Sequence, residues 1–212
     1  MKQCTFQEMK KLKLEHGGSA TSGKRKEARA LSTKKAMHLI FKSEIATGNL
    51  ALNTPQNRSL IIQNLKRLAK QFSLTIYKYA VVHSHIHLFV RTRSREALQS
   101  FLKCFPGIVA RRITHSEKGR KLDTPFWSQL VWTKIISNSA FKSVAEYIER
   151  NTLEGYGLIR RFKTPQGEKI VITSPLKVFI EKCKVLNIPP TSILAFLSVY
   201  ASRELLKLLK QA

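Results

Sequence analysis

Alternating apolar and polar positions predict strands in this chain, and apolar residues at helical spacing predict helices between them. The expected strands are residues 37–43, 74–82, 85–93 and 126–136. The expected helices begin near residues 57, 96 and 139. The order strand, helix, hairpin, helix, strand, helix is typical of a ferredoxin-like α+β sandwich. In such a fold, helices cover one face of an antiparallel sheet and the other face is left open.

Proline and glycine mark the less regular parts of the pattern. Pro106-Gly107 is expected to kink or break the second helix, because proline lacks the N–H that an α-helix requires. After Gly155 we expect a short strand near 169–173, a helix at 175–185, and an apolar helix after Pro189-Pro190. That last helix needs a partner surface, which is either its own domain or a second copy of the chain.

Two histidines stand inside the strand expected at 85–93. Side chains at i and i+2 share one face of a strand, so His85 and His87 project together while Ile86 and Leu88 face the core. Two imidazoles on a rigid strand form half of a metal site. A pair of solvated histidines on an open sheet face is the alternative, and the spacing alone does not decide between them.

The charge of the chain narrows the choice of partner. The 212 residues contain 38 Lys and Arg against 13 Asp and Glu, which gives a net charge of +25. So large an excess favours a polyanionic partner, with nucleic acid as the main candidate and an anionic membrane surface as the alternative. Neither a membrane-spanning run nor a signal peptide is present, so we expect a soluble cytoplasmic protein. Three widely spaced cysteines argue against a disulfide framework.

Basic residues gather in two regions. Residues 10–36 combine glycine and serine with closely spaced lysine and arginine, which favours a mobile arm that either settles onto phosphates or stays solvated. The second region follows Pro106-Gly107. The candidate nucleic-acid-binding residues are Lys24, Arg25, Lys26, Arg29, Lys34, Lys35, Arg111, Arg112, Lys118, Arg120 and Lys121. The aromatic residues Trp127, Trp132 and Tyr77 are candidates for stacking on unpaired bases, with core packing as the alternative.

A second constellation lies in the helix expected at 139–154. Tyr147 and Asn151 are four residues apart, so a phenol and an amide share one helix face. Together with His85-Ile86-His87, the segment Tyr147-Ile148-Glu149-Arg150-Asn151 resembles the single-tyrosine HUH-superfamily transposases. The resemblance is to the REP-associated and IS200-like members, and it extends from about residue 36 to residue 157.

The resemblance implies a chemistry for these four residues. Tyr147 would be the nucleophile that cuts single-stranded, hairpin-forming DNA and keeps a 5′-phosphotyrosine link, and rejoining would reverse that step. His85, His87 and Asn151 would hold Mg²⁺ or Mn²⁺. The protein would act as a monomer or homodimer in a bacterial cytoplasm, associated with the nucleoid. The alternative is a domesticated protein that binds hairpin DNA and cleaves it little or not at all.

We therefore divide the chain into three parts. Residues 1–35 are expected to be a basic flexible arm, residues 36–160 a catalytic α+β domain, and residues 161–212 a mainly helical extension. In this arrangement the helices cover one face of the sheet and the histidines occupy the other. His83 and His115 are expected to be structural or solvated, since neither matches a ligand position of the family.

Overall fold

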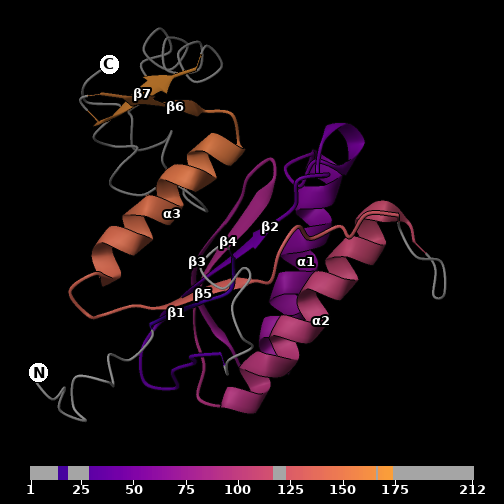
Figure 1. Ribbon diagram of the computed structural model, residues 1–212, viewed down its shortest axis with the longest axis vertical. Helices are drawn as coiled ribbons and strands as arrows, with labels where there is room; N and C mark the ends of the chain where they lie inside the picture. The colour runs from indigo at the N-terminus through magenta and orange to yellow at the C-terminus, as the bar shows by residue number, and fades with distance from the viewer. Residues whose placement is uncertain (1–13, 19–28, 117–122, 166, 174–212) are drawn as a thin grey trace, which may run out of the picture.

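A five-stranded antiparallel sheet lies at the centre of the computed structural model, which describes residues 14–18, 29–116, 123–165 and 167–173 (Figure 1). Its strand order is β1-β5-β2-β4-β3. The strands are Glu15–His16 (β1), Met37–Lys42 (β2), Thr75–Val81 (β3), His85–Arg91 (β4) and Trp132–Ile135 (β5). A second, two-stranded sheet consists of Ile159–Thr164 (β6) and Gly167–Ile172 (β7).

The helices lie on both faces of the larger sheet. They are Pro55–Gln71 (α1), Arg95–Thr114 (α2) and Phe141–Gly155 (α3), with a short 3₁₀ turn at Gly48–Leu50 (η3). Figure 1 shows α1 and α2 side by side against one face and α3 across the other. This confirms the predicted ferredoxin-like α+β fold, with β3 and β4 forming the expected hairpin.

Alternation along β2 and β4 separates the two faces. Met37, Leu39 and Phe41 of β2 are buried in the main core with Ile86, Leu88 and Val90 of β4. This core also takes the apolar stripes of α1 and α2. The intervening side chains, which include His38 and His87, therefore point to the face that α3 crosses.

The open face expected from the sequence is covered in part by α3. Ile148 of α3 packs in a smaller cluster with Phe89 of β4, Ala80 of β3 and Ile136. Val144 and Ala145 pack against the same cluster. The apolar stripe of α3 is therefore buried against this face of the sheet. As a result, the face that carries the histidines is partly covered by α3.

Local capping explains where α1 and α2 begin. The Thr54 side chain accepts a hydrogen bond from the Asn57 backbone N–H at 3.2 Å, with Pro55 in the first turn of α1. The Ser94 side chain accepts one from the Ala97 N–H at 3.1 Å at the start of α2. Both residues satisfy a backbone donor that has no partner within the helix.

Of the predicted kink or break in the second helix, the break is wrong, because α2 continues through Pro106. Its neighbours Phe105 and Val109 are fully buried in the main core, and Phe101 stacks on Phe105 at 5.1 Å between ring centroids. Burial of this apolar stripe offsets the single backbone hydrogen bond that proline removes.

The fourth predicted strand is shorter than expected. Only residues 132–135 of the range 126–136 pair in the sheet, while residues 126–131 run past the end of β2. There the Ser43 hydroxyl donates a hydrogen bond to the Phe126 carbonyl, and the Ser128 N–H donates to the Lys42 carbonyl at 3.0 Å. Phe126 itself is buried in the main core, which fixes this turn of chain.

Part of the predicted arm belongs to the sheet. Glu15–His16 pairs with β5, and the Gly18 N–H donates to the Leu130 carbonyl at 3.0 Å. Gly17 adopts φ +85°, and a β-carbon there would lie 2.2 Å from the Val131 carbonyl oxygen. Only glycine allows this close approach of the two backbones. The edge of the sheet is thus extended by residues that precede the predicted domain.

The region after α3 is partly described. β7 confirms the strand expected near 169–173, whereas its partner β6 was not predicted and runs across the boundary expected at residue 160. The predicted helices at 175–185 and after Pro190 lie outside the described residues.

Candidate functional site

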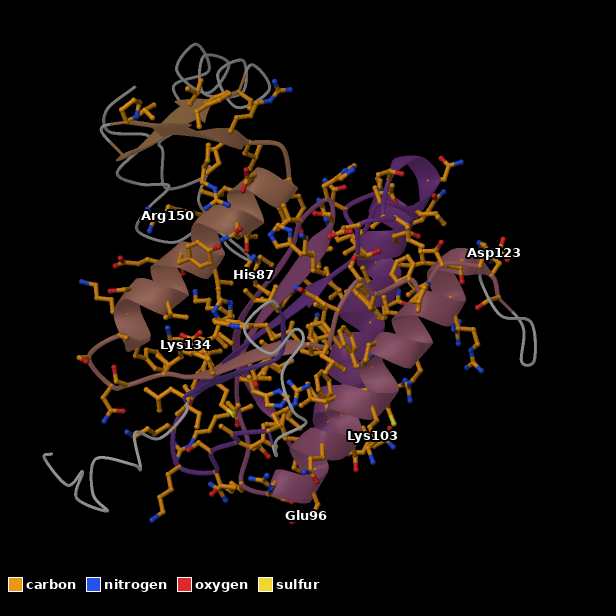
Figure 2. The ribbon with its side chains drawn as sticks, in the orientation of Figure 1. His87, Glu96, Lys103, Asp123, Lys134 and Arg150 are labelled. Atoms are coloured by element: carbon orange, nitrogen blue, oxygen red, sulfur yellow. The ribbon has the colours of Figure 1, made fainter. Side chains whose placement is uncertain are left out.

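His85 and His87 lie on one face of β4, as the alternation predicts. Their ring centroids are 4.7 Å apart and nearly perpendicular. His85 is half-buried at the end of the strand, but His87 is only 1% exposed because α3 passes over it. The expectation that this face of the sheet is open is therefore wrong at His87. Figure 2 shows His87 between the sheet and α3.

A third histidine, which the sequence analysis did not single out, completes the cluster. His38 of β2 stacks on His87, with ring centroids 5.2 Å apart and its Nε2 3.0 Å from His87 Nδ1. It comes next to His87 through the pairing of β2 with β4. The signal in the sequence was its place in the expected strand 37–43, on the side opposite Leu39.

Burial keeps these imidazoles neutral near pH 7. It lowers the pKa of His38 to about 4, with a smaller contribution from the positive charge of Lys134. Burial also lowers the pKa of His87 well below its ordinary 6.5, and the adjacent His85 and His38 act in the same direction. The pKa of His85 is lowered by burial, against the opposing charge of Glu154. Neutral imidazoles are the form that ligates metal ions.

Tyr147 and Asn151 share one face of α3, as predicted, and this face is turned to the sheet. The Tyr147 ring lies edge-on to His87 at 5.5 Å and to His38 at 6.1 Å between centroids, and the residue is 37% exposed. Asn151 is fully buried one turn later, and its Nδ2 donates to the Tyr147 carbonyl at 2.7 Å. One chain therefore brings together all four predicted residues.

Arg161 of β6 is a further member of the site that the sequence analysis missed. Its Nη2 donates to Asn151 Oδ1 at 2.8 Å, and its Nε donates to Glu154 Oε2 at 2.8 Å. The guanidinium carbon lies 5.7 Å from the centre of the Tyr147 ring. No sequence motif links Arg161 to Asn151, which stands ten residues earlier. The place of Arg161 in the site is therefore apparent only from the fold, in which it lies on β6.

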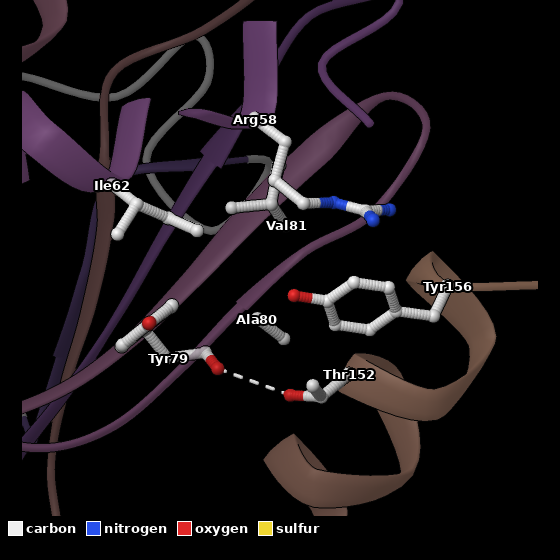
Figure 3. Close-up of a pocket in the computed structure, with 7 residues that line it drawn as sticks. All are labelled: Arg58, Ile62, Tyr79, Ala80, Val81, Thr152 and Tyr156. Carbon is white, nitrogen blue, oxygen red and sulfur yellow. Dashed lines mark hydrogen bonds between the residues drawn. The ribbon is translucent and has the colours of Figure 1, made fainter. Parts of the chain in front are cut away.

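The position of α3 is fixed by a tight joint at its C-terminal end (Figure 3). The Thr152 hydroxyl donates to the Tyr79 carbonyl at 3.0 Å, and the Arg58 guanidinium lies 3.9 Å over the Tyr156 ring and donates to the Gly155 carbonyl. A β-carbon at Gly155 would lie 2.2 Å from the Val81 carbonyl oxygen. This contact leaves room only for glycine and holds Tyr147 two turns earlier over the histidines of its own chain.

Imidazole nitrogens and an amide oxygen are donor types that bind divalent cations. His87 Nε2 is buried with no hydrogen-bond partner. The Asn151 amide, its near neighbour, is committed to the Tyr147 carbonyl and to Arg161. A buried ring nitrogen without a hydrogen-bond partner has a desolvation cost that a ligand would offset. No group of three or more His, Cys, Asp or Glu in the described part of the chain is arranged to hold a metal. A cation here therefore depends on Asn151 and on substrate oxygens as additional ligands.

The predicted basic residues are scattered. Arg29 faces inward, where its guanidinium donates to the Val131 carbonyl and burial lowers its pKa. Lys34 and Lys35 are exposed beside β2, whereas Arg111 and Arg112 are exposed on α2, across the sheet from the histidines. The other candidates, Lys24, Arg25, Lys26, Lys118, Arg120 and Lys121, lie outside the described residues.

The other histidines and aromatic residues singled out from the sequence differ in burial and position. His83 is exposed in the turn between β3 and β4, and His115 is exposed at the C-terminal end of α2. Trp127 packs against Phe41 and donates from Nε1 to the Pro106 carbonyl at 2.9 Å, and Tyr77 packs against Phe89 and Phe141. Trp132 alone of the three stacking candidates lies beside the histidines, edge-on to His38 at 5.4 Å.

A family comparison agrees with the resemblance to IS200-like transposases. The family model described as "Transposase IS200 like" matches residues 35–151, a span that includes His38, His85, His87, Tyr147 and Asn151. A crystal structure from Deinococcus radiodurans, described as that of a "putative transposase", matches 60% of this chain and 98% of its own, at 21% identity and a TM-score of 0.38. No curated protein sequence matches. In the described residues, no helix has both the length and the apolar character needed to cross a membrane.

Proposed function

Because the chain belongs to the IS200-like transposase family, we propose that it cuts and rejoins single-stranded, hairpin-forming DNA with Tyr147 as its nucleophile. The observation that carries this proposal is the position of the Tyr147 ring 5.5 Å from His87, whose Nε2 is buried and unpartnered. A half-exposed phenol beside an unused buried imidazole nitrogen is arranged for contact with a substrate rather than for packing.

The cleavage step exchanges one phosphodiester bond for another. The Tyr147 hydroxyl oxygen attacks the scissile phosphorus and releases its proton, the bond from phosphorus to O3′ breaks, and the 3′ oxygen takes up a proton. The product is a 5′-phosphotyrosine and a free 3′-hydroxyl. Attack by a 3′-hydroxyl on that link reverses the step, so strands are rejoined without a nucleotide cofactor.

His85, His87 and Asn151 would hold Mg²⁺ or Mn²⁺ next to Tyr147. When bound, such an ion neutralises charge on the scissile phosphate and polarises it toward attack. Asn151 Oδ1 has two lone pairs, so it can accept from Arg161 and still ligate a cation. His38 holds His87 from behind through the 3.0 Å contact to Nδ1, which leaves Nε2 to face the site.

Arg161 is placed to bind the phosphate. Its guanidinium lies beside Tyr147 and Asn151, and its pairing with Glu154 holds it there in one orientation. A phosphate that approaches Tyr147 therefore meets a fixed cation with several donors, which suits phosphate oxygens.

Covalent capture of DNA tests the proposal. The protein is incubated with a labelled library of single-stranded hairpins and Mn²⁺, and the products are separated on a denaturing gel. We expect a labelled band at the mass of the protein plus DNA, absent with EDTA and absent for Tyr147→Phe, which keeps the ring but has no nucleophile. A native-gel shift without any covalent band in the parent would instead support the non-cleaving hairpin-binding protein. A band of normal yield from Tyr147→Phe would place the nucleophile elsewhere, with Tyr156 as the next candidate.

A further inference from the structure

An open groove continues from the Tyr147 site along the sheet. It lies between β2, β5 and the first half of α3 and has a volume of about 390 Å³. We call it the Trp132 groove; it is lined by His38, Ile40, Trp132, Lys134, Ile136, Ala140, Ser143, Val144 and Tyr147. Tyr147 and His38 thus belong both to the groove and to the cluster described above, so whatever fills the groove lies next to the phenol.

The lining combines a flat aromatic surface, apolar walls and one cation. Trp132 is half-buried on β5 and forms a side of the groove, with Ile40 and Val144 as apolar neighbours. Lys134 is two residues further along the same face of β5, and its side chain is 41% exposed. Its ion pair with Glu15 at 2.5 Å is solvent-exposed on both sides, so the lysine remains available to another anion.

Two features indicate what fills this groove. Its walls are too apolar for a bare phosphate chain, and its indole offers the π-face on which unpaired bases stack. Its cation and its junction with Tyr147 suit the sugar-phosphate backbone of the same nucleotide. A volume of about 390 Å³ is within the range of small-molecule sites, and so admits one planar base.

We propose that the Trp132 groove binds one unpaired nucleobase of the strand whose phosphate is attacked at Tyr147. The base stacks on Trp132 between Ile40 and Val144, and Lys134 contacts the adjoining phosphate. The proposal rests on the proposed function, because it takes the bound strand to be the one that Tyr147 cleaves. It adds to that function a contact that forms only when the nucleotide carries a base. The groove thereby sets which phosphate of a bound strand comes to lie beside the Tyr147 hydroxyl.

Binding measurements in EDTA test the groove without any cleavage. The probes are a thymidine homopolymer of about 12 nucleotides, within the usual site sizes for single strands, and a strand of equal length in which every base is replaced by an abasic site. Both carry the same phosphates and differ only in stacking groups. Affinity is measured by fluorescence anisotropy for the parent, Trp132→Ala, Trp132→Phe and Leu130→Ala. Leu130 is 65% exposed, lies two residues away and is not part of the groove, which makes it the matched control.

We expect Trp132→Ala to weaken binding of the homopolymer by about 5- to 150-fold, the range for one base–aromatic stack, and to leave binding of the abasic strand unchanged. Trp132→Phe should retain most of the affinity and Leu130→Ala all of it. In Trp127→Phe, Trp132 is the only tryptophan of the chain, and its fluorescence should be quenched by the homopolymer but not by the abasic strand.

The possible failures are distinguishable. Equal losses on both strands in Trp132→Ala, or unquenched Trp132 fluorescence with saturating homopolymer, would overturn the groove proposal and leave Tyr147 chemistry intact. An adduct absent from the parent, together with selective loss on the homopolymer, would keep the groove and overturn the cleavage proposal. No binding of either strand by the parent would overturn the groove proposal, whereas the cleavage proposal would still be decided by the adduct with hairpin DNA.

Discussion

His38 Nε2 lies 3.0 Å from His87 Nδ1, and this contact determines which nitrogen of His87 faces the site. If His87 donates from Nδ1 to His38, its Nε2 carries a lone pair, as a metal ligand must. Both rings are almost fully buried, so water does not replace the partner when one is removed.

Replacing His38 should therefore weaken metal binding without touching a ligand. We expect His38→Leu to lower Mn²⁺ affinity by about 10- to 100-fold, the usual effect of losing the partner of a ligating histidine. His38→Gln keeps an acceptor and should retain most of the affinity. Calorimetric titration with Mn²⁺ measures both, and ¹⁵N NMR of the His87 ring reports its tautomer. Equal affinity in the leucine and glutamine variants would contradict a role through the hydrogen bond.

Alanine variants of His85 and His87 should both lose adduct formation, but they should differ in their effect on the free energy of unfolding. His85 is half-buried at a strand end, so His85→Ala should abolish adduct formation and change the free energy of unfolding by less than about 1 kcal/mol. His87 is 1% exposed, so His87→Ala should abolish the adduct and also cost about 1–3 kcal/mol through the void it leaves. Urea melts in EDTA and adduct yield in Mn²⁺ are measured in parallel, with the exposed turn residue His83→Ala as the control. Full adduct yield in His85→Ala would remove it from the site.

Stability should fall in mild acid because the cluster is buried in its neutral form. The folded-state pKa of His38 is about 4 against 6.5 for an exposed histidine, so the unfolded chain binds more protons between these values. The contribution is complete above pH 6.5 and is lost as the pH falls toward 4. From pH 7 to pH 5, His38 alone should lower the free energy of unfolding by about 2 kcal/mol, and the lowered pKa values of His85 and His87 act in the same direction.

The measurement is a series of urea melts in EDTA over this range, where most carboxylates remain ionised. His38→Leu should show a smaller slope than the parent. A parent whose stability is flat from pH 7 to pH 5 would mean that the histidines become protonated without cost, and would contradict their burial.

The fold was predictable where one local pattern sufficed. The alternation in residues 85–91 assigned Ile86 and Leu88 to the core and His85 and His87 to the opposite face, because strand side chains alternate whatever surrounds them. The four-residue spacing of Tyr147 and Asn151 was equally local. The side on which α3 packs was not predictable, since the stripe containing Val144 and Ile148 can cover either face of a sheet. For the same reason the burial of His87 was missed.

The missed site residues depend on pairings between distant strands. His38 reaches His87 only because β2 pairs with β4 in one register, and a slip of one residue would turn it to the other face. Arg161 reaches Asn151 only because β6 turns back beside the C-terminal part of α3. The helix break expected at Pro106 was wrong for a different reason. Proline does disfavour a helix interior, but burial of Phe105 and Val109 in the core outweighs that local cost.

Binding of single strands should weaken with salt, since contacts to phosphate release counterions. Lys134 lies on β5 beside the Trp132 groove, whereas Lys103 is exposed on α2, on the opposite side of the sheet from Tyr147 (Figure 2). We expect Lys134→Ala to reduce the slope of log affinity against log salt by about 0.7, the value for one contact to a single strand, and Lys103→Ala to leave it unchanged. Anisotropy titrations at several salt concentrations measure the slopes. Equal effects of the two lysines would indicate that DNA also follows the α2 face, where Arg111 and Arg112 lie.

Arg161 should act on the reaction more than on the fold. Its guanidinium bridges Asn151 and Glu154 and lies 5.7 Å from the Tyr147 ring, so its removal takes away both the restraint on the Asn151 amide and the fixed positive charge at the site. A positive charge also repels a divalent cation, but the pairing with Glu154 screens that repulsion. We therefore expect the loss of phosphate contacts to dominate, and Arg161→Ala to lower the rate of adduct formation at saturating DNA by at least tenfold, the scale of one charge-assisted hydrogen bond.

Arg161→Lys serves as the matched variant, because it keeps the charge but cannot bridge two acceptors in one plane. Compared with Arg161→Ala, we expect Arg161→Lys to bind hairpin DNA more tightly. Its rate of adduct formation should still stay well below that of the parent, since the Asn151 amide is no longer held. Single-turnover rates and affinities in EDTA separate the two effects, and melting temperatures show whether the β6 contact to α3 survives. Tighter Mn²⁺ binding and faster cleavage in Arg161→Ala would reverse the assignment, because they would mean that the guanidinium competes with the metal ion for Asn151.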